Sequence, residues 1–191
     1  MKIGLYFGTF NPIHSGHLII ANTILQQTDL KKIWFVVSPQ NPLKEKSDLL
    51  NHRHRLEMVN LAIEGNENFS ACDVEFRLPV PSFTIDTLGF LRKKFPQHEF
   101  SIIMGSDNLE GIHLWKNYEE LIADYKFFVY RRGKFDEAKW KSKSNIHILD
   151  VPLLNISSTH IRNLLKEKKS AQYLLPDAVW KFVSETNLYR K

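Results

Sequence analysis

The chain has 191 residues, a formal net charge of +5 and 43% hydrophobic residues. This length predicts one domain over residues 1–191, and the apolar fraction suffices for a packed core, which excludes a disordered chain. Cys72 is the single cysteine; this excludes intramolecular disulfides and cysteine-rich zinc sites and favours a reducing compartment. No apolar run approaches the roughly 18 residues of a membrane span, and polar residues follow the apolar start at once, which excludes a signal peptide. We therefore expect a cytoplasmic protein.

The positive charge suits anionic partners, either nucleic acid or small polyphosphates. Lysines are scattered, with modest groupings at residues 93–94 and 166–169, and no arginine-rich arm is present. An extended nucleic-acid surface is therefore not required, although charge alone leaves both partner classes open.

The first predicted elements are a buried strand over residues 3–7 and a helix over residues 18–25, with a polar turn between them. Such a turn offers backbone N–H groups at a helix N-terminus, where anions are favoured. His14 and His17 lie three residues apart, so in a first helical turn they would share a face and point at the same ligand. Two surface histidines in a tight turn, or half of a metal site, remain open as alternatives.

Strands alternate with helices along the rest of the chain. Further strands are predicted at residues 33–37, 69–76, 100–104, 126–130 and 146–149, and helices after Asn51, from Thr84, weakly at 115–123, and at 161–168 and 176–183. This order predicts an α/β fold, a Rossmann-like doubly wound parallel sheet of five to six strands with a small C-terminal helical portion at residues 157–191. Loops that leave strands at Gly8, Pro39, Gly105 and Arg131 should then converge on one crevice beyond the strand ends.

Several familiar motifs are absent from the sequence. There is no G-x-x-x-x-G-K-[ST], no G-x-G-x-x-G and no G-x-S-x-G, so a Walker-type NTPase, an ordinary dinucleotide-binding loop and a serine hydrolase lack support. A structural zinc site is disfavoured because His14 and His17 have no evident third ligand nearby.

A second informative stretch, residues 156–162, reads I-S-S-T-H-I-R. Its simplest interpretation is an ordinary helix cap built from hydroxyl residues. Three successive hydroxyls followed by Arg162 one turn later also make an anion site, because a guanidinium can donate two hydrogen bonds to a phosphate. Two such helix starts in one small domain indicate a substrate with several phosphates.

Together these stretches resemble the T/H-x-G-H and I-S-S-T-x-I-R signatures of the nucleotidyltransferase superfamily. The segment P-S-F-T-I-D-T-L at residues 81–88, the G-x-D…W pattern of residues 105–115 and Y-L-L-P at residues 173–176 are similar to segments of the bacterial nicotinate-nucleotide adenylyltransferases. This resemblance covers nearly the whole chain. It departs from the family at Phe7, where a second glycine is usual, at Asn11, where aspartate is usual, and at Leu43, where histidine is usual.

The resemblance implies transfer of AMP from ATP to nicotinate mononucleotide in NAD biosynthesis, giving nicotinate adenine dinucleotide and pyrophosphate by direct in-line attack without a covalent intermediate. A phosphate nucleophile is already ionised at pH 7, so no general base is needed, and positioned donors should carry catalysis. Nicotinamide mononucleotide or phosphopantetheine could be the acceptor instead. A non-catalytic nucleotide- or RNA-binding module is the competing class.

The resemblance also implies site residues. The catalytic donors to the phosphates are His14, His17, Lys44 and Arg162. ATP binding is expected of Gly8, Thr9, Phe10, His14, His17, Gly105, Asp107, Ile156, Ser157, Ser158, Thr159 and Arg162, and nicotinate-nucleotide binding of Asn41, Thr84, Trp115 and Arg131. For Asp107 a helix cap, and for Trp115 a place in the core, remain alternatives.

The cofactor implied is Mg²⁺, bound through the ATP phosphates rather than by protein ligands. The partners implied are the small molecules ATP and nicotinate mononucleotide, with no nucleic acid and no membrane. Homo-oligomerisation is left open.

Overall fold

The computed structural model describes residues 1–40, 49–133, 135–152 and 154–189. Six strands form one parallel sheet in the order β3-β2-β1-β4-β5-β6. They are β1 (Lys2–Gly8), β2 (Lys32–Val37), β3 (Phe69–Cys72), β4 (Glu99–Gly105), β5 (Lys126–Tyr130) and β6 (Ile146–Leu149). The predicted Rossmann-like parallel sheet is confirmed.

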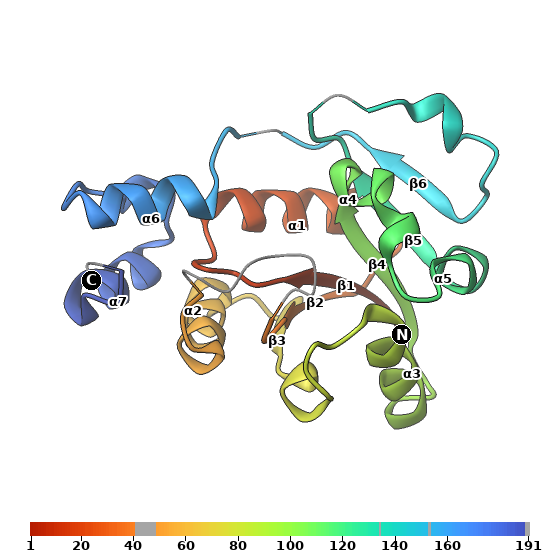
Figure 1. The fold of residues 1–191 in the computed structure, drawn as a ribbon, viewed down its shortest axis with the longest axis horizontal. Helices are drawn as coiled ribbons and strands as arrows, with labels where there is room; N and C mark the ends of the chain where they lie inside the picture. Colours follow the sequence, from red (N-terminus) through yellow and green to blue (C-terminus); the bar gives the residue numbers. More distant parts are fainter. Residues whose placement is uncertain (41–48, 134, 153, 190–191) are drawn as a thin grey trace.

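Seven α-helices accompany the sheet in the described ranges (Figure 1). They are α1 (Ser15–Gln27), α2 (His52–Ile63), α3 (Thr84–Lys94), α4 (Ser106–Glu110), α5 (Tyr118–Asp124), α6 (Ser158–Lys166) and α7 (Asp177–Thr186). The predicted cap of α2 is confirmed, since the Asn51 side chain accepts a hydrogen bond from the Arg53 N–H at 2.9 Å. None of the helices in the described residues is long and apolar enough to cross a membrane.

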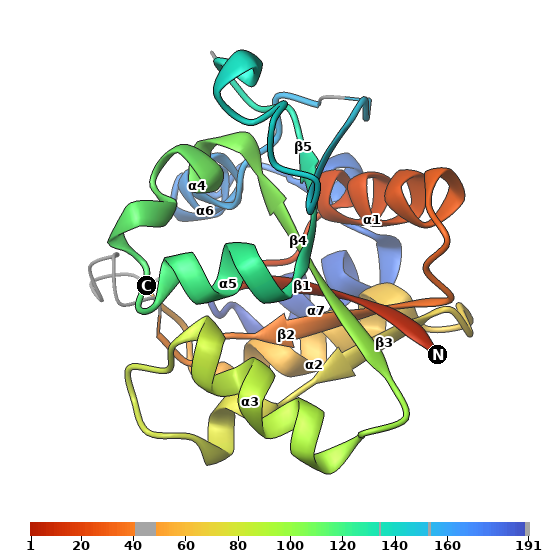
Figure 2. The same ribbon diagram turned by 90° about the vertical axis from the view of Figure 1, so that its right-hand side faces the viewer.

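Apolar side chains of the central strands alternate between two cores, as expected for strands covered on both faces. In β2, Phe35 packs into the core that includes residues of α1, α2, α6 and α7, whereas its neighbour Val36 packs into the core that includes residues of α3, α4 and α5. Figure 2 shows α3 and α5 in front of the sheet. Both faces of the sheet are therefore closed, which leaves the ends of the strands for a binding site.

The chain direction across the sheet reverses at β1. β2 and β3 are added on one side of β1, and the chain then crosses to add β4, β5 and β6 on the other. The loops that follow β1 and β4 consequently diverge to opposite faces, and in such sheets this switch point is where ligands bind.

Two local predictions are wrong. Residues 69–76 were predicted as one strand, but β3 ends at Cys72 and a 3₁₀ turn (η1, Val74–Arg77) follows, closed by a bond from the Phe76 N–H to the Asp73 carbonyl at 2.9 Å. After Gly105 we predicted a loop, but α4 begins directly at Ser106. The Ser106 hydroxyl is bonded to both backbone groups of Arg132, which ties the start of α4 to the end of β5.

The N-terminal ends of α1 and α6 lie against each other, although they are far apart in the sequence (Figure 1). The Ser158 hydroxyl donates a hydrogen bond to the Pro12 carbonyl at 2.9 Å, which joins the two helix starts. Each helix presents the positive end of its dipole at this junction. The fold therefore concentrates positive potential beyond the end of β1.

Candidate active site

Two adjoining cavities open at the carboxyl ends of the central strands. The first, of about 400 Å³, is lined by both motif stretches and is called the histidine cavity; the second, of about 160 Å³, reaches Trp115 and is called the tryptophan cavity. Both are lined by Gly8, Thr9, Gln40 and Asn108. A molecule bound in one cavity would therefore lie next to a molecule bound in the other.

The two histidines form a stacked pair on the wall of the histidine cavity. His14 is the N-cap residue of α1 and His17 lies in its first turn, with ring centroids 3.7 Å apart. The His14 backbone N–H donates to Nδ1 of His17 at 3.2 Å. Because an accepting nitrogen carries no proton, the proton of His17 is on Nε2, the nitrogen that can donate to a ligand.

His14 is buried, whereas His17 is only partly buried. Burial, and to a lesser degree the positive charge of Arg132, lowers the pKa of the His14 imidazole to about 4. His14 is therefore neutral at pH 7 and unsuited to titrate during turnover. Within the described residues its Nδ1 is a buried atom for which no hydrogen-bond partner is found, and the side chain lies on the cavity wall.

Arg162 extends from α6 to the loop that follows β1. Its guanidinium donates to the Asn11 carbonyl at 2.9 Å and to the Thr159 hydroxyl at 3.3 Å. Ser157 caps the same helix by accepting from the His160 N–H at 3.1 Å. A guanidinium has five N–H donors, so these two bonds leave others for an anion in the cavity that Arg162 lines.

The tryptophan cavity is built around the start of α3. Phe83 is the N-cap residue and Thr84 begins the helix, and both line the cavity with Trp115. Glu75 is 2% exposed and accepts hydrogen bonds from the Ser82 hydroxyl at 2.8 Å and the Thr87 hydroxyl at 2.9 Å. Burial raises the pKa of this carboxyl. The start of α3 is thus held in place by a buried acid.

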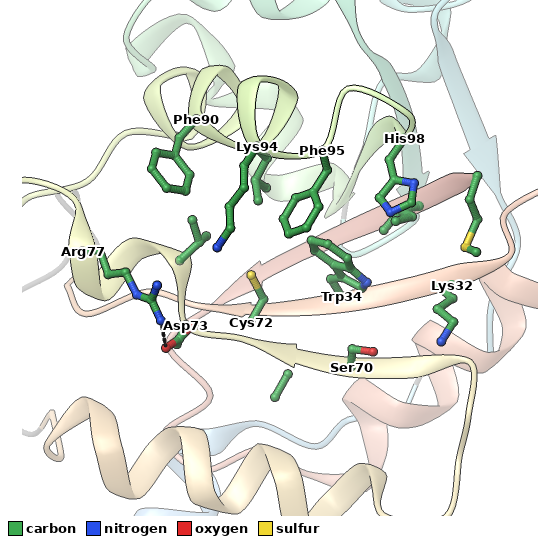
Figure 3. A pocket seen from close by; sticks show the side chains of 15 residues that line it. Lys32, Trp34, Ser70, Cys72, Asp73, Arg77, Phe90, Lys94, Phe95 and His98 are labelled. Carbon is green, nitrogen blue, oxygen red and sulfur yellow. Dashed lines mark hydrogen bonds and ion pairs between the residues drawn. The ribbon is translucent and has the colours of Figure 1, made fainter.

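A third cavity, of about 370 Å³, lies away from the motif loops, near the beginning of β1 and β2 and the end of α3 (Figure 3). Trp34, Phe95 and Lys94 line it, together with Cys72. Burial raises the pKa of the Cys72 thiol to about 11, so this sulfur is a protonated thiol at pH 7 and not a nucleophile. None of the predicted site residues lines this cavity.

Comparison with known proteins decides the family. A model of the cytidylyltransferase-like family matches residues 5–164. A probable nicotinate-nucleotide adenylyltransferase of Flavobacterium johnsoniae is 51% identical over 193 residues, which cover 100% of both chains. The chain belongs to the nicotinate-nucleotide adenylyltransferases. A probable member from Bacillus licheniformis is 37% identical over 188 residues, 98% of both chains.

The fold agrees with solved structures of similar proteins. A Plasmodium falciparum nicotinic acid mononucleotide adenylyltransferase complexed with NaAD superposes with a TM-score of 0.81 at 24% identity, covering 98% of this chain and 97% of that one. The same protein complexed with APC gives a TM-score of 0.82 at 23% identity. At this identity the likeness concerns the fold alone.

The structure brings most of the predicted adenylyltransferase residues together. The predicted residues that line the histidine cavity are Gly8, Thr9, Phe10, His14, His17, Ile156, Ser157, Ser158, Thr159 and Arg162. Those that line the tryptophan cavity include Thr84, Gly105 and Trp115. Asn41 and Lys44, and the family departure at Leu43, lie outside the described residues.

Two predicted residues have other positions. Asp107 does not line either cavity. Its carboxylate pairs with the guanidinium of Arg132 at 3.4 Å, and Arg132 lines the histidine cavity. Arg131 lines neither cavity, since its guanidinium bonds Glu137 at 2.7 Å and also bonds Asp150. The two arginines that follow β5 thus have different environments: Arg131 bonds Glu137 and Asp150, whereas Arg132 lines the histidine cavity.

Three charged residues at the site or directly behind it were not predicted from the sequence: Arg132, Glu75 and Arg55. The available signal for Arg132 was its position directly after Arg131, which was itself a predicted site residue. Glu75 was assigned to a strand, and Arg55 has the spacing of an ordinary helical surface residue. Their roles depend on burial, which a single sequence does not reveal.

The family departure at Asn11 has a structural counterpart. Its Oδ1 accepts hydrogen bonds from the Tyr189 hydroxyl at 2.9 Å and from the Leu50 N–H at 3.4 Å. An amide oxygen meets both donors as a carboxylate would, without bringing a negative charge to the end of β1.

Proposed function

We propose that the chain transfers AMP from ATP to nicotinate mononucleotide, with release of pyrophosphate, as a step of NAD biosynthesis. The observation that carries this proposal is the pair of adjoining cavities: one is lined by His14, His17 and Arg162 from two helix starts, the other by Trp115 and the start of α3. Relatives named probable nicotinate-nucleotide adenylyltransferases, which align with this chain over their full length, support the same reaction.

The reaction needs little covalent help from the protein. A phosphate oxygen of nicotinate mononucleotide attacks the α-phosphorus of ATP, the bond from that phosphorus to the bridging oxygen breaks, and pyrophosphate leaves with the electron pair. The attacking phosphate is ionised at pH 7, so no base is required. What the site must stabilise is the negative charge of the in-line transition state.

In this proposal His17 donates its Nε2–H to the α-phosphate. The bond from the His14 N–H to Nδ1 of His17 supports this role, because it fixes both the ring orientation and the position of the proton. His14, buried and neutral, is a second donor on the same wall. Neither residue has to change its protonation state.

The β- and γ-phosphates are assigned to the start of α6, where Ser158, Thr159 and Arg162 line the cavity. The helix dipole and the guanidinium both favour anions there. Lys44 is proposed as an additional donor by family resemblance, and its position lies outside the described residues.

Mg²⁺ is proposed to enter bound to the ATP phosphates. Within the described ranges no cluster of three histidine, cysteine, aspartate or glutamate side chains could hold a metal ion. Mg²⁺ commonly keeps several waters and binds through substrate phosphates. A cavity whose side chains can donate hydrogen bonds to those phosphates fits that arrangement. The metal would neutralise phosphate charge, while His17 and Arg162 orient the chain of phosphates.

The nicotinate group is assigned to the tryptophan cavity. Trp115 offers a stacking surface, and the backbone N–H groups at the start of α3 favour its carboxylate. Asn41 is proposed as a helper and lies outside the described residues. Arg131 is left out of this assignment because its guanidinium is bonded to Glu137 and Asp150.

The test is a paired-substrate assay. Purified protein with ATP and magnesium should release pyrophosphate far faster with nicotinate mononucleotide than with nicotinamide mononucleotide, because only the first carries the carboxylate that α3 favours. Equal rates would reject the carboxylate assignment. Absence of pyrophosphate release with both, together with salt-sensitive RNA binding, would favour the non-catalytic RNA-binding class instead.

The proposal includes a cytoplasmic location, which the single unpaired cysteine supports.

A further inference from the structure

A fully buried arginine lies directly behind the motif loops. Arg55, on α2, has an exposed fraction of 0%. Its guanidinium donates to four backbone carbonyls: Nη1 to Thr9 at 2.5 Å and to Ser38 at 2.7 Å, Nη2 to Pro39 at 2.9 Å and Nε to Leu50 at 2.9 Å. Among the ion pairs of the described residues none involves Arg55, and the partners of its guanidinium there are these four carbonyl oxygens.

These carbonyls belong to three separate segments. Thr9 follows β1, Ser38 and Pro39 follow β2, and Leu50 precedes α2. Thr9 lines both cavities, and Ser38 lines the tryptophan cavity. One rigid planar group therefore sets the spacing between the loop that leads to the histidines and the loop that leaves β2. A lysine ammonium, with three donors at a single point, cannot reproduce this fork.

The same bonds orient the loops toward an anion. The peptide bonds after Thr9 and Pro39 are trans, so their C=O and N–H groups point in opposite directions. With both carbonyls turned to Arg55, the N–H groups of Phe10 and Gln40 point away from it, and both of these residues line the histidine cavity. Carbonyl oxygens that would repel a phosphate are thus drawn to the rear of the loops.

We propose that Arg55 is a positioning residue for AMP transfer: it fixes the loops after β1 and β2 so that their N–H groups and His17 meet the phosphates in reactive alignment. This inference rests on the proposed function. Arg55 has no predicted contact with substrate and acts through the backbone of Thr9, Ser38 and Pro39.

The test compares Arg55→Lys with the control Arg53→Lys, which makes the same exchange at an exposed position of the same helix. A displacement of about 1 Å in catalytic alignment costs on the order of 10²-fold in rate. We expect kcat of Arg55→Lys to fall about 100-fold, while KM for ATP and for nicotinate mononucleotide each change less than about threefold. Arg53→Lys should retain the wild-type kcat.

Assays should run well below the melting temperature of each variant, so that lost stability does not lower kcat. A lowered melting temperature with unchanged kcat would mean a purely structural role and would overturn the inference. A raised KM with unchanged kcat would overturn it too, because that pattern reports lost binding and not lost alignment. An inactive wild-type protein would instead reject the proposed function.

If Arg55→Lys does not fold, a measurement on the wild-type protein decides. With ¹⁵N-labelled arginine, the Nε–H signal of Arg55 should exchange slowly with water, and it should shift when a non-hydrolysable ATP analogue saturates the protein. A signal that stays unchanged at saturation would show that the loops held by Arg55 do not sense the nucleotide, and would overturn the inference.

Discussion

At the scale of single residues, the backbone N–H of His14 determines which ring nitrogen of His17 carries the proton. The His14 N–H occupies Nδ1 of His17, and stacking of the two rings keeps the imidazole from turning. The spacing H-x-x-H thus serves two purposes. It puts both imidazoles on one face of the helix, and it lets the His14 N–H bond to Nδ1 of His17. A neutral ring with a fixed Nε2–H is a donor and not a base.

The first prediction concerns this donor. His17→Ala should lower kcat by about 10²–10³-fold, the scale observed when one oxyanion donor is removed. The effect should appear in steady-state pyrophosphate release under saturating substrates. Near-normal turnover would contradict the role assigned to His17.

A matched control is available at His160, an exposed histidine in the first turn of α6. His160→Ala should turn over at the wild-type rate, because its side chain is not among those that line either cavity. Circular dichroism of both variants should match the wild-type protein, which separates lost catalysis from lost folding.

At the scale of elements, the early end of β3 has a consequence for the site. The turn at Val74–Arg77 brings Glu75 inward, where it binds the hydroxyls of Ser82 and Thr87 and so fixes both the segment before α3 and the first turn of the helix. A continued strand would leave α3 without this anchor. The residues at the end of the predicted strand 69–76 therefore position the predicted nicotinate-binding end instead of extending the sheet.

This anchor predicts a change in substrate affinity. Glu75→Gln replaces an acceptor of two hydroxyl donors with a group that has only one acceptor oxygen, and a hydrogen bond to a charged partner contributes about 1.5–3 kcal/mol. KM for nicotinate mononucleotide should rise by about tenfold or more, while KM for ATP should change little. The comparison is Lys93→Gln, a change at an exposed position near the end of α3, the helix that Glu75 anchors. Equal increases in both KM values would contradict a role confined to α3.

At the scale of the whole molecule, the sequence predicted the parallel sheet and the meeting of two distant motifs. Continuous apolar runs marked the strands, and the rule that ligands bind beyond their carboxyl ends placed the motif loops in one crevice. The starts of α1 and α6 meet as expected, joined by hydrogen bonds from Ser158 and Arg162, and their binding of anions stays a prediction.

What the sequence did not reveal are the buried charges behind the loops. Arg55 and Glu75 look like solvated residues in a linear pattern, because charged side chains are seldom fully buried. Their partners are backbone carbonyls and hydroxyls from distant segments, and such pairings depend on the folded geometry. The place of Arg132 at the cavity was not predicted for the same reason, since its pairing with Asp107 also depends on the folded geometry.

The central claim is direct transfer between two substrates held in adjoining cavities. The most direct measurement is the stereochemical course at the α-phosphorus, using one diastereomer of ATPαS with nicotinate mononucleotide and assigning the configuration of the dinucleotide product. A single in-line displacement predicts inversion of configuration. Retention would require two displacements through a covalent nucleotidyl-protein, and would contradict the mechanism proposed for this site.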